Sequence, residues 1–234
     1  MKIRKPFKII AFDADDTLWI NEPHYGEVEH QVENLLKQYL DAPDLKEQLY
    51  AREKVNLKLF GYGAKGFVLS LIETAIELTD SKISAADIHQ IISWGKDMLT
   101  RPIEVLEGVE NVLHELEEDY ALMLLTKGDL FDQESKLARS NLARYFTHVE
   151  IVSEKNEQVY QGILDRYGIA ASDLLMVGNS LRSDILPMVE IGVTAIHIPY
   201  HTTWVHELVN SKEAEKTSYL EFEQISKVLD WVRS

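Results

Sequence analysis

The residues best suited to chemistry follow the first apolar segment, where Lys8-Ile9-Ile10-Ala11-Phe12 leads into Asp13-Ala14-Asp15-Asp16-Thr17. A carboxylate such as Asp13 can attack phosphorus and form an aspartyl-phosphate, which divides one difficult step into two. Asp15 can protonate the leaving oxygen and later take a proton from water. We expect the two carboxylates at adjacent exposed turns, so that one stays ionised while the other carries a proton. Taken alone, the cluster is equally typical of a solvated turn.

Polar residues also end three later apolar segments. Thr126 and Lys127 follow Ala121–Leu125, where a hydroxyl and backbone N–H groups suit phosphate oxygens. Lys155 follows Val149–Val152 and can neutralise transition-state charge.

Asn179 and Asp184 follow Leu174–Val177. Asp184 offers the oxygen ligand that Mg²⁺ prefers, and Asn179 can support Asp184 or hold a metal-bound water. Taken alone, Asp184 is more typical of a helix N-cap.

The segments between these residues predict the fold. Five apolar runs predict strands, at 8–12, 121–125, 149–152, 174–177 and 193–198. Helical patterns separate or follow them, at 109–117, 131–142, 156–167, 184–191 and 222–232. This alternation predicts an α/β core with a Rossmann-like parallel sheet covered on both faces. Ligands of such sheets bind beyond the carboxyl ends of the strands, where the polar residues above stand.

The stretch from about Tyr25 to Leu99 has helical periodicity and no convincing strand. Its glycines predict a loop over 60–66, and Ser84 with Asp87 predicts a helix N-cap. We therefore expect an all-helical domain at 21–99, inserted into a core made of 1–20 and 100–234. Phe67 is expected in a helix core, and Trp19, Tyr62 and Lys65 are candidates for contact with substrate.

Composition excludes several classes. The 234 residues contain no Cys, so disulfides, thiolate metal sites and a Cys nucleophile are excluded. The formal net charge of −15 disfavours nucleic-acid binding, which needs basic surface. No apolar run is as long as a membrane span. We expect a soluble cytoplasmic protein with a small phosphorylated molecule as its partner; the sequence does not indicate the oligomeric state.

These residues resemble the four motifs of the haloacid dehalogenase superfamily. Asp13, Asp15 and Thr17 match the Asp-x-Asp-x-Thr motif, and Thr126 matches the Ser or Thr that follows a buried strand. Lys155 matches the third motif, and Gly178-Asn179-Ser180-Leu181-Arg182-Ser183-Asp184 matches the fourth. The helical insert is similar to the C1-type cap of that family.

The resemblance implies a role for each residue. Asp13 would be the nucleophile and Asp15 the general acid and base. Mg²⁺ would bind the carboxylates of Asp13 and Asp184 and the backbone carbonyl of Asp15, whereas Thr126, Lys127 and Lys155 would hold the phosphoryl group. Two positions depart from the common pattern: Asn179 stands where many members have Asp, and Lys127 where Asn is common.

Several reactions fit this resemblance. Asp15 favours phosphate esters, because dehalogenases of the family lack an acid at this position. A Mg²⁺-dependent phosphomonoesterase with a movable helical lid is therefore the first hypothesis. A 2-haloacid dehalogenase, a phosphonatase that uses Lys65 and a phosphomutase are enzyme alternatives. A non-catalytic module that binds a phosphorylated ligand is an alternative of another class.

Overall fold

The computed structural model describes residues 5–41, 44–209 and 218–234. The chain divides into two compact units, Met1–Glu22 with Ile103–Ser234 and Pro23–Pro102. The first is called the core unit below and the second the helical unit. Because Pro23–Pro102 interrupts the core unit in sequence, the helical unit is an insert.

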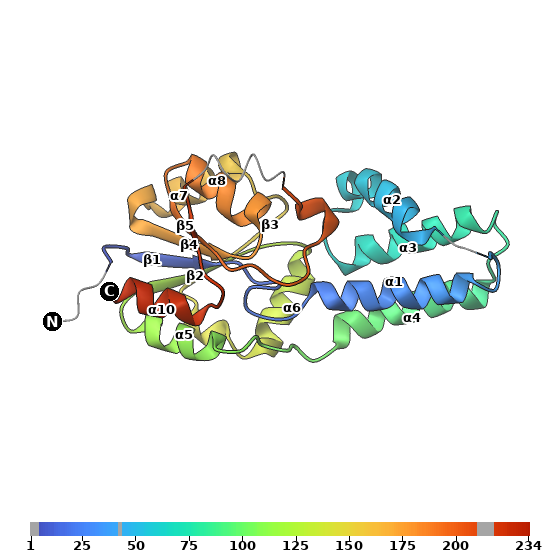
Figure 1. The fold of residues 1–234 in the computed structure, drawn as a ribbon, viewed down its shortest axis with the longest axis horizontal. Helices are drawn as coiled ribbons and strands as arrows, with labels where there is room; N and C mark the ends of the chain where they lie inside the picture. Colours follow the sequence, from blue (N-terminus) through green and yellow to red (C-terminus); the bar gives the residue numbers. More distant parts are fainter. Residues whose placement is uncertain (1–4, 42–43, 210–217) are drawn as a thin grey trace. The chain divides into compact units, whose positions relative to one another are not determined.

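The core unit contains one six-stranded sheet with the strand order β3-β2-β1-β4-β5-β6. Figure 1 labels β1 to β5 of this sheet. All five pairings between neighbouring strands are parallel. The strands are β1 (Ile9–Phe12), β2 (Ala121–Lys127), β3 (His148–Val152), β4 (Leu174–Gly178), β5 (Thr194–His197) and β6 (Leu220–Glu221). The expected α/β fold with a Rossmann-like parallel sheet is therefore confirmed.

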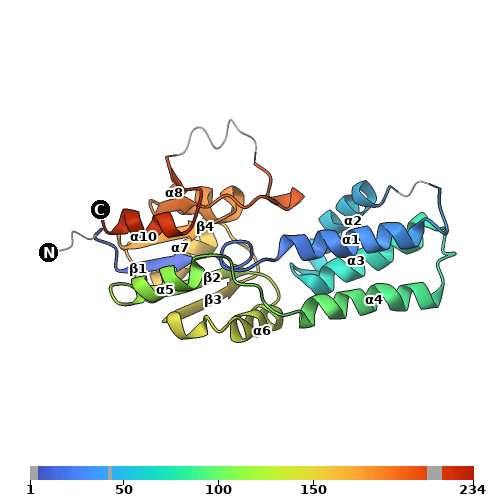
Figure 2. The same cartoon turned by 60° about the horizontal axis from the view of Figure 1, so that its bottom comes forward.

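Helices cover both faces of the sheet, as Figures 1 and 2 show. On one face, α5 (Val109–Glu117), α6 (Leu130–Ser140) and α10 (Ser226–Val232) pack against alternate strand residues such as Ile10 and Phe12. On the other, α7 (Glu157–Tyr167) and α8 (Leu186–Glu190) pack against the residues between them, such as Ala11. Successive strand residues point to opposite faces, so continuous apolar strands build two separate cores.

The helical unit consists of four helices in the described part of the chain. They are α1 (Glu22–Leu36), α2 (Leu45–Phe60), α3 (Ala64–Leu78) and α4 (Ala85–Thr100). Their apolar faces form a third core, in which Phe67 is buried as expected and packs against Tyr25 at a ring-centroid distance of 4.8 Å. Ser84 caps α4 as expected, because its side chain accepts a hydrogen bond from the Asp87 N–H.

Three elements differ from the sequence-based expectation by three or more residues at a boundary. The loop between α2 and α3 spans only residues 61–63. The helix expected over 184–191 begins earlier, as the π-helical turn η3 (Leu181–Ile185), so Asp184 lies inside a turn and does not cap a helix. The segment expected to form a helix over 222–232 is helical only from Ser226, and the short strand β6 precedes it.

Within the core unit, the two connections to the insert lie beside each other. The Ile20 N–H donates to the Glu104 carbonyl, and the Leu106 N–H donates to the Leu18 carbonyl, both at 2.9 Å. Trp19 forms an antiparallel bridge with Val105. The insert therefore leaves and re-enters the core unit at one short two-stranded ladder.

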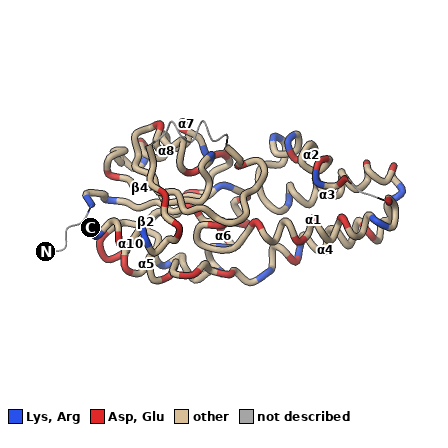
Figure 3. Tube along the Cα trace, in the orientation of Figure 1, with Lys and Arg blue, Asp and Glu red and all other residues tan. Residues whose placement is uncertain are grey.

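Charged residues are spread along both units, and acidic residues outnumber basic ones by 39 to 24 (Figure 3).

None of the helices described here is both long and apolar enough to span a lipid bilayer.

Candidate active site

The site forms at the carboxyl end of β1, where the strand order changes direction. The chain runs from β1 outward through β2 and β3 and then returns to β4 on the other side of β1. The Asp13 N–H donates to the Val177 carbonyl at 2.9 Å, which extends the β1–β4 ladder by one residue. Parallel α/β sheets bind ligands beyond the strand ends at such a switch point.

Asp13, Lys155 and Asp184 meet there, although they lie far apart in sequence. The Lys155 Nζ is 2.5 Å from Asp13 Oδ1 and 2.6 Å from Asp184 Oδ1. All three side chains are buried, with at most 9% of any of them exposed. The expectation that both aspartates lie at exposed turns is therefore wrong, because the Asp13 carboxylate is buried against the Lys155 ammonium and the Asp15 side chain is only 21% exposed.

Two carboxylates at one buried ammonium leave a net negative charge. Burial, and then the Asp184 carboxylate, raise the pKa of Asp13 to about 7, although Lys155 acts in the opposite direction. Burial lowers the pKa of Lys155, but the charges of Asp13 and Asp184 outweigh it and hold that pKa well above its usual range. Lys155 is therefore a permanent cation at this point.

Thr17 and Asn179 join Asp13 to the fourth motif. The Thr17 Oγ1 donates to Asp13 Oδ2 at 2.9 Å and accepts from the Asn179 backbone N–H at 3.0 Å. With its NH₂ turned toward this cluster, the Asn179 side chain donates to Asp13 Oδ2 and to the Asp15 carbonyl, both at 3.2 Å. A carboxylate of Asp13 and the carbonyl of Asp15 thus face the same amide.

The Asp15 carboxylate accepts hydrogen bonds from three side chains. Trp19 Nε1 donates to Oδ1 at 2.7 Å, Gln133 Nε2 donates to Oδ2 at 2.8 Å, and Lys136 Nζ lies 3.0 and 3.1 Å from the two oxygens. Burial raises the pKa of Asp15, but the Lys136 charge and the hydrogen bonds outweigh burial and hold the pKa below its usual range. In this arrangement Asp15 is ionised, the form that accepts a proton.

The same face of α6 also fixes the loop after β2. Gln133 Nε2 donates to the Lys127 carbonyl at 3.1 Å. Gly128 has φ +151°, and a Cβ there would lie 2.9 Å from Gln133 Nε2, so only glycine fits without a shift. Lys136 Nζ also donates to Asn21 Oδ1 at 2.8 Å. Asp15 is thereby connected both to the end of β2 and to the residue before α1.

Thr126 and Lys127, the residues expected to hold phosphate, end β2. Thr126 is 1% exposed. The Lys127 ammonium lies 2.7 Å from Glu207 Oε1 and 3.1 Å from Ser183 Oγ, so its charge is neutralised within the protein. The Gly128 N–H donates to the Val152 carbonyl at 3.1 Å, so in this arrangement it does not point to a phosphate oxygen. Phosphate binding by Thr126 and Lys127 stays a prediction.

The remaining expected residues lie in different places. Trp19 is fully buried in the core unit, where it contacts the site through Asp15. Tyr62 lies in the loop between α2 and α3, and Lys65 lies in the first turn of α3, both within the helical unit. Their contact with substrate stays a prediction.

Sequence reasoning missed four residues around the site, Gln133, Lys136, Tyr160 and Glu207. Gln133 and Lys136 were detectable in principle, because positions three apart share one helix face and these follow the Thr126 motif closely. Tyr160, whose hydroxyl donates to the Ser183 carbonyl at 2.7 Å, and Glu207 carry no comparable signal.

The donor set at Asp13 fits a hard divalent cation. Asp13 and Asp184 supply two carboxylates, and the Asp15 carbonyl supplies a third oxygen beside Asp13. A Cβ on Gly178 would lie only 2.4 Å from Asp184 Oδ2, so glycine leaves the space this carboxylate occupies. No three His, Asp or Glu side chains in the described residues form a metal cage. Mg²⁺ does not need one, because it retains waters beside one or two carboxylates.

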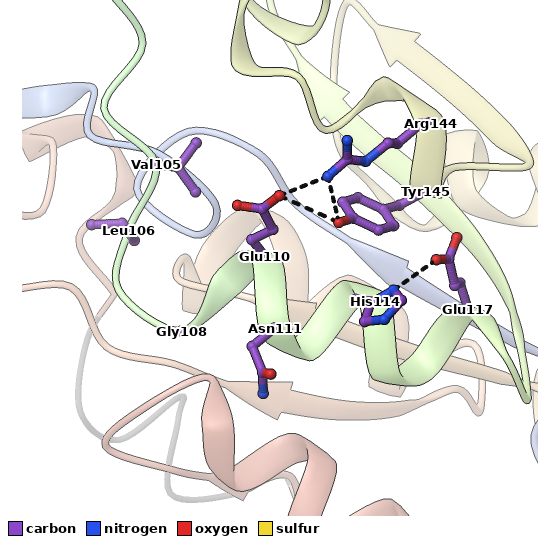
Figure 4. Close-up of a pocket in the computed structure, with 9 residues that line it drawn as sticks. All are labelled: Val105, Leu106, Gly108, Glu110, Asn111, His114, Glu117, Arg144 and Tyr145. Carbon is purple, nitrogen blue, oxygen red and sulfur yellow. Dashed lines mark hydrogen bonds and ion pairs between the residues drawn. The ribbon is translucent and has the colours of Figure 1, made fainter.

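A separate pocket of about 880 Å³ lies on the core unit (Figure 4). It is lined by Val105, Leu106, Gly108, Glu110, Asn111, His114, Glu117, Arg144 and Tyr145. Arg144 and Tyr145 contact Glu110, and His114 contacts Glu117, so several of the lining side chains contact one another. None of the expected site residues lines it.

Comparisons with known proteins show what the chain is similar to. The model of the haloacid dehalogenase-like hydrolases matches residues 7–192. The crystal structure of a haloacid dehalogenase-like family hydrolase from Xanthomonas campestris is 44% identical, covering 88% of this chain and 86% of that one with a TM-score of 0.80. The glyceraldehyde 3-phosphate phosphatase of Pyrococcus furiosus is 24% identical over 202 residues, which are 82% of this chain and 81% of that protein.

The N-acylneuraminate-9-phosphatase of Rattus norvegicus is 28% identical over 106 residues, or 43% of this chain and 40% of that protein. This match covers a smaller part of both chains, whereas the family match spans β1 to α8. The chain belongs to the haloacid dehalogenase-like hydrolases, as the resemblance of its motifs implied.

Proposed function

We propose that this chain is a Mg²⁺-dependent phosphomonoesterase that works through an aspartyl-phosphate at Asp13. The observation that carries the proposal is the convergence of Asp13 and Asp184 on the Lys155 ammonium, with the Asp15 carboxyl two residues along the chain. A nucleophile, a second carboxylate for a cation and a fixed positive charge are the parts that phosphoryl transfer needs.

In the first step, an Asp13 carboxylate oxygen bonds to phosphorus and the bond from phosphorus to the ester oxygen breaks. The departing oxygen takes a proton from Asp15. Because the surroundings of Asp15 hold its pKa low and leave it ionised, Asp15 must take up a proton before this step. In the second step, water attacks phosphorus, the Asp13–phosphorus bond breaks and the water proton goes to the Asp15 carboxylate. Inorganic phosphate leaves, Asp13 is again a free carboxylate, and Asp15 again carries the proton that it gave up in the first step.

Lys155 is placed to reduce repulsion between Asp13 and the incoming anion, since its ammonium is 2.5 Å from Asp13 Oδ1. Mg²⁺ held by the Asp13 and Asp184 carboxylates and the Asp15 carbonyl would supply the further positive charge that the phosphoryl group requires. Thr126 and the backbone of Lys127 would bind the remaining phosphoryl oxygens.

The relatives support a small, sugar-like phosphate monoester as substrate. Their names give glyceraldehyde 3-phosphate and an N-acylneuraminate 9-phosphate, both of which carry phosphate on a hydroxylated carbon chain. The helical unit would act as a lid that excludes water and selects among such esters, with Tyr62 and Lys65 as contacts.

The test is an assay of triose, hexose, sugar-acid and nucleoside monophosphates, in Mg²⁺ and in EDTA. Asp13→Asn keeps the shape of the side chain but removes its nucleophilic oxygen. We expect phosphate release only with wild-type protein and Mg²⁺, and a loss of at least about 10³-fold in Asp13→Asn, because the covalent route is removed. Equal turnover by both proteins would contradict the proposal.

The same preparations test two of the alternatives, the dehalogenase and the non-catalytic binding module. Release of chloride from 2-haloacids would identify a dehalogenase. Saturable binding of a phosphate ester without turnover, in the presence of Mg²⁺, would identify a non-catalytic binding module. The presence of Asp15 favours the phosphatase, because neither alternative needs an acid that protonates an alkoxide.

A further inference from the structure

Glu207 lies outside the four motifs, in the short 3-10 helical turn Val205–Glu207 that follows β5. Its side chain is 12% exposed. Oε2 accepts hydrogen bonds from Ser180 Oγ at 2.5 Å and from Ser183 Oγ at 2.6 Å, and Oε1 accepts from Lys127 Nζ at 2.7 Å. One mostly buried carboxylate thus connects the end of β2, the turn after β4 and the loop after β5.

The direction of each hydrogen bond is fixed. Ser180 Oγ accepts from the Ser183 N–H at 3.0 Å, and Ser183 Oγ accepts from Lys127 Nζ at 3.1 Å. Each hydroxyl has one proton, and each donates it to Glu207 Oε2. A carboxylate that accepts from three donors matches all of them only when it is ionised.

These serines belong to the turn that carries Asp184. Ser180 is the N-cap of η3, and its backbone N–H donates to Asp184 Oδ2 at 2.9 Å. Arg182 Nη1 donates to the His206 carbonyl at 2.8 Å and connects the same turn to the Glu207 loop a second time. The path from Glu207 to the Asp184 carboxylate is therefore two hydrogen bonds long, through Ser180.

We propose that Glu207 is a positioning residue that holds the Ser180–Asp184 turn in the geometry needed for binding a divalent metal. Side chains that support metal ligands typically affect metal affinity or activity by about 10- to 100-fold. π-Helical turns are rare and need support from their surroundings. Glu207 provides that support through the two serine hydroxyls, and the Lys127 ammonium neutralises the mostly buried Glu207 carboxylate. The inference deepens the proposed function and rests on its metal site.

The experiment measures the affinity for Mn²⁺ alone, a paramagnetic substitute for Mg²⁺, by electron paramagnetic resonance of the free ion. Glu207→Gln keeps the size of the side chain, but only one end of the amide is an acceptor. The variant therefore cannot accept hydrogen bonds from both hydroxyls and from the Lys127 ammonium. Glu207→Asp keeps the charge near Lys127 but is too short to reach both hydroxyls. We expect each variant to bind Mn²⁺ about 10-fold or more weakly than wild type.

Val205→Ala is the matched control, because Val205 lies in the same turn with 46% of its surface exposed. It should bind Mn²⁺ as wild type does. If Glu207→Gln does not fold, Glu207→Asp decides the question alone. Affinity within two-fold of wild type in a folded Glu207 variant, or no Mn²⁺ binding by wild type, would overturn the proposal.

The readout separates this inference from the proposed function. Hydrolysis that needs Mg²⁺ and Asp13, together with unchanged Mn²⁺ affinity in the Glu207 variants, would remove only the inference. Weakened Mn²⁺ binding in those variants, together with no hydrolysis of any ester, would remove only the phosphatase. Circular dichroism of each variant shows whether the change is confined to the site.

Discussion

Gly178, the last residue of β4, makes room for Asp184. A Cβ at this position would lie 2.4 Å from Asp184 Oδ2 and 2.6 Å from its Cγ, which is closer than atoms can approach. Gly178→Ala should therefore displace the Asp184 carboxylate, lower stability by about 1–3 kcal/mol, and raise the Mg²⁺ concentration needed for half-maximal activity. A Mg²⁺ titration of activity and urea unfolding check the two effects.

Gly162→Ala is the control for that substitution. Gly162 lies in α7, and a Cβ there would meet nothing within 4 Å. Alanine is favoured over glycine inside a helix by about 0.5–1 kcal/mol, so this variant should be slightly more stable with an unchanged Mg²⁺ requirement. The same Mg²⁺ dependence in Gly178→Ala and wild type would show that Asp184 tolerates the displacement or does not bind the metal.

At the scale of single elements, α1 carries a carboxylate whose charge is disfavoured by folding. Burial, and then the charge of Glu53 on α2, raise the pKa of Glu29. A raised pKa means that the ionised form is penalised in the folded protein, fully so at pH above the folded pKa. The penalty disappears as the pH falls through the folded pKa to below the usual value of a glutamate.

We therefore expect Glu29→Gln to be more stable than wild type at pH 7 and to lose this advantage at about pH 4, near the ordinary glutamate pKa. Urea unfolding at several pH values measures the difference. Glu47→Gln, at an exposed position in the first turn of α2, is the control for the removal of one carboxylate from the helical unit. A Glu29 variant that is less stable at pH 7 than at pH 4, relative to wild type, would contradict the expectation.

Sequence patterns predicted most elements of the core, because buried parallel strands are continuous apolar runs and the helices that cover them repeat apolar residues at helical spacing. The predicted bounds of β1, β2, β4, α5 and α7 lie within two residues of the observed ones. They did not predict the two-residue strand β6, which is too short to show a pattern, or the π-helical turn η3, which depends on tertiary support.

The sequence likewise predicted some residues of the site and missed others. Asp13, Lys155 and Asp184 were predicted because each follows a strand end, and strand ends of a parallel sheet share one edge. The contact of both carboxylates with the Lys155 ammonium depends on the tertiary structure, and sequence patterns do not show it. Glu207 was not predicted, because its loop has no periodicity and its partners are brought to it by three other segments.

For the molecule as a whole, the informative feature is how the insert joins the core unit. The Ile20 N–H bonds to the Glu104 carbonyl and the Leu106 N–H to the Leu18 carbonyl, so the two connections already lie side by side without the insert. The core unit also has its own apolar clusters on both sheet faces. These contacts lie entirely within the core unit, so its fold should not depend on the helical unit.

We therefore predict that a chain in which residues 23–102 are replaced by a flexible linker of about six residues, which can span up to ~20 Å, folds cooperatively. It should still hydrolyse p-nitrophenyl phosphate with Mg²⁺, more slowly than wild type because water is less excluded, and it should discriminate less among sugar phosphates. Circular dichroism during urea unfolding and kcat/KM for several esters test this. A non-cooperative transition would show that the core unit needs the insert to fold, and unchanged discrimination would place substrate selection in the core unit.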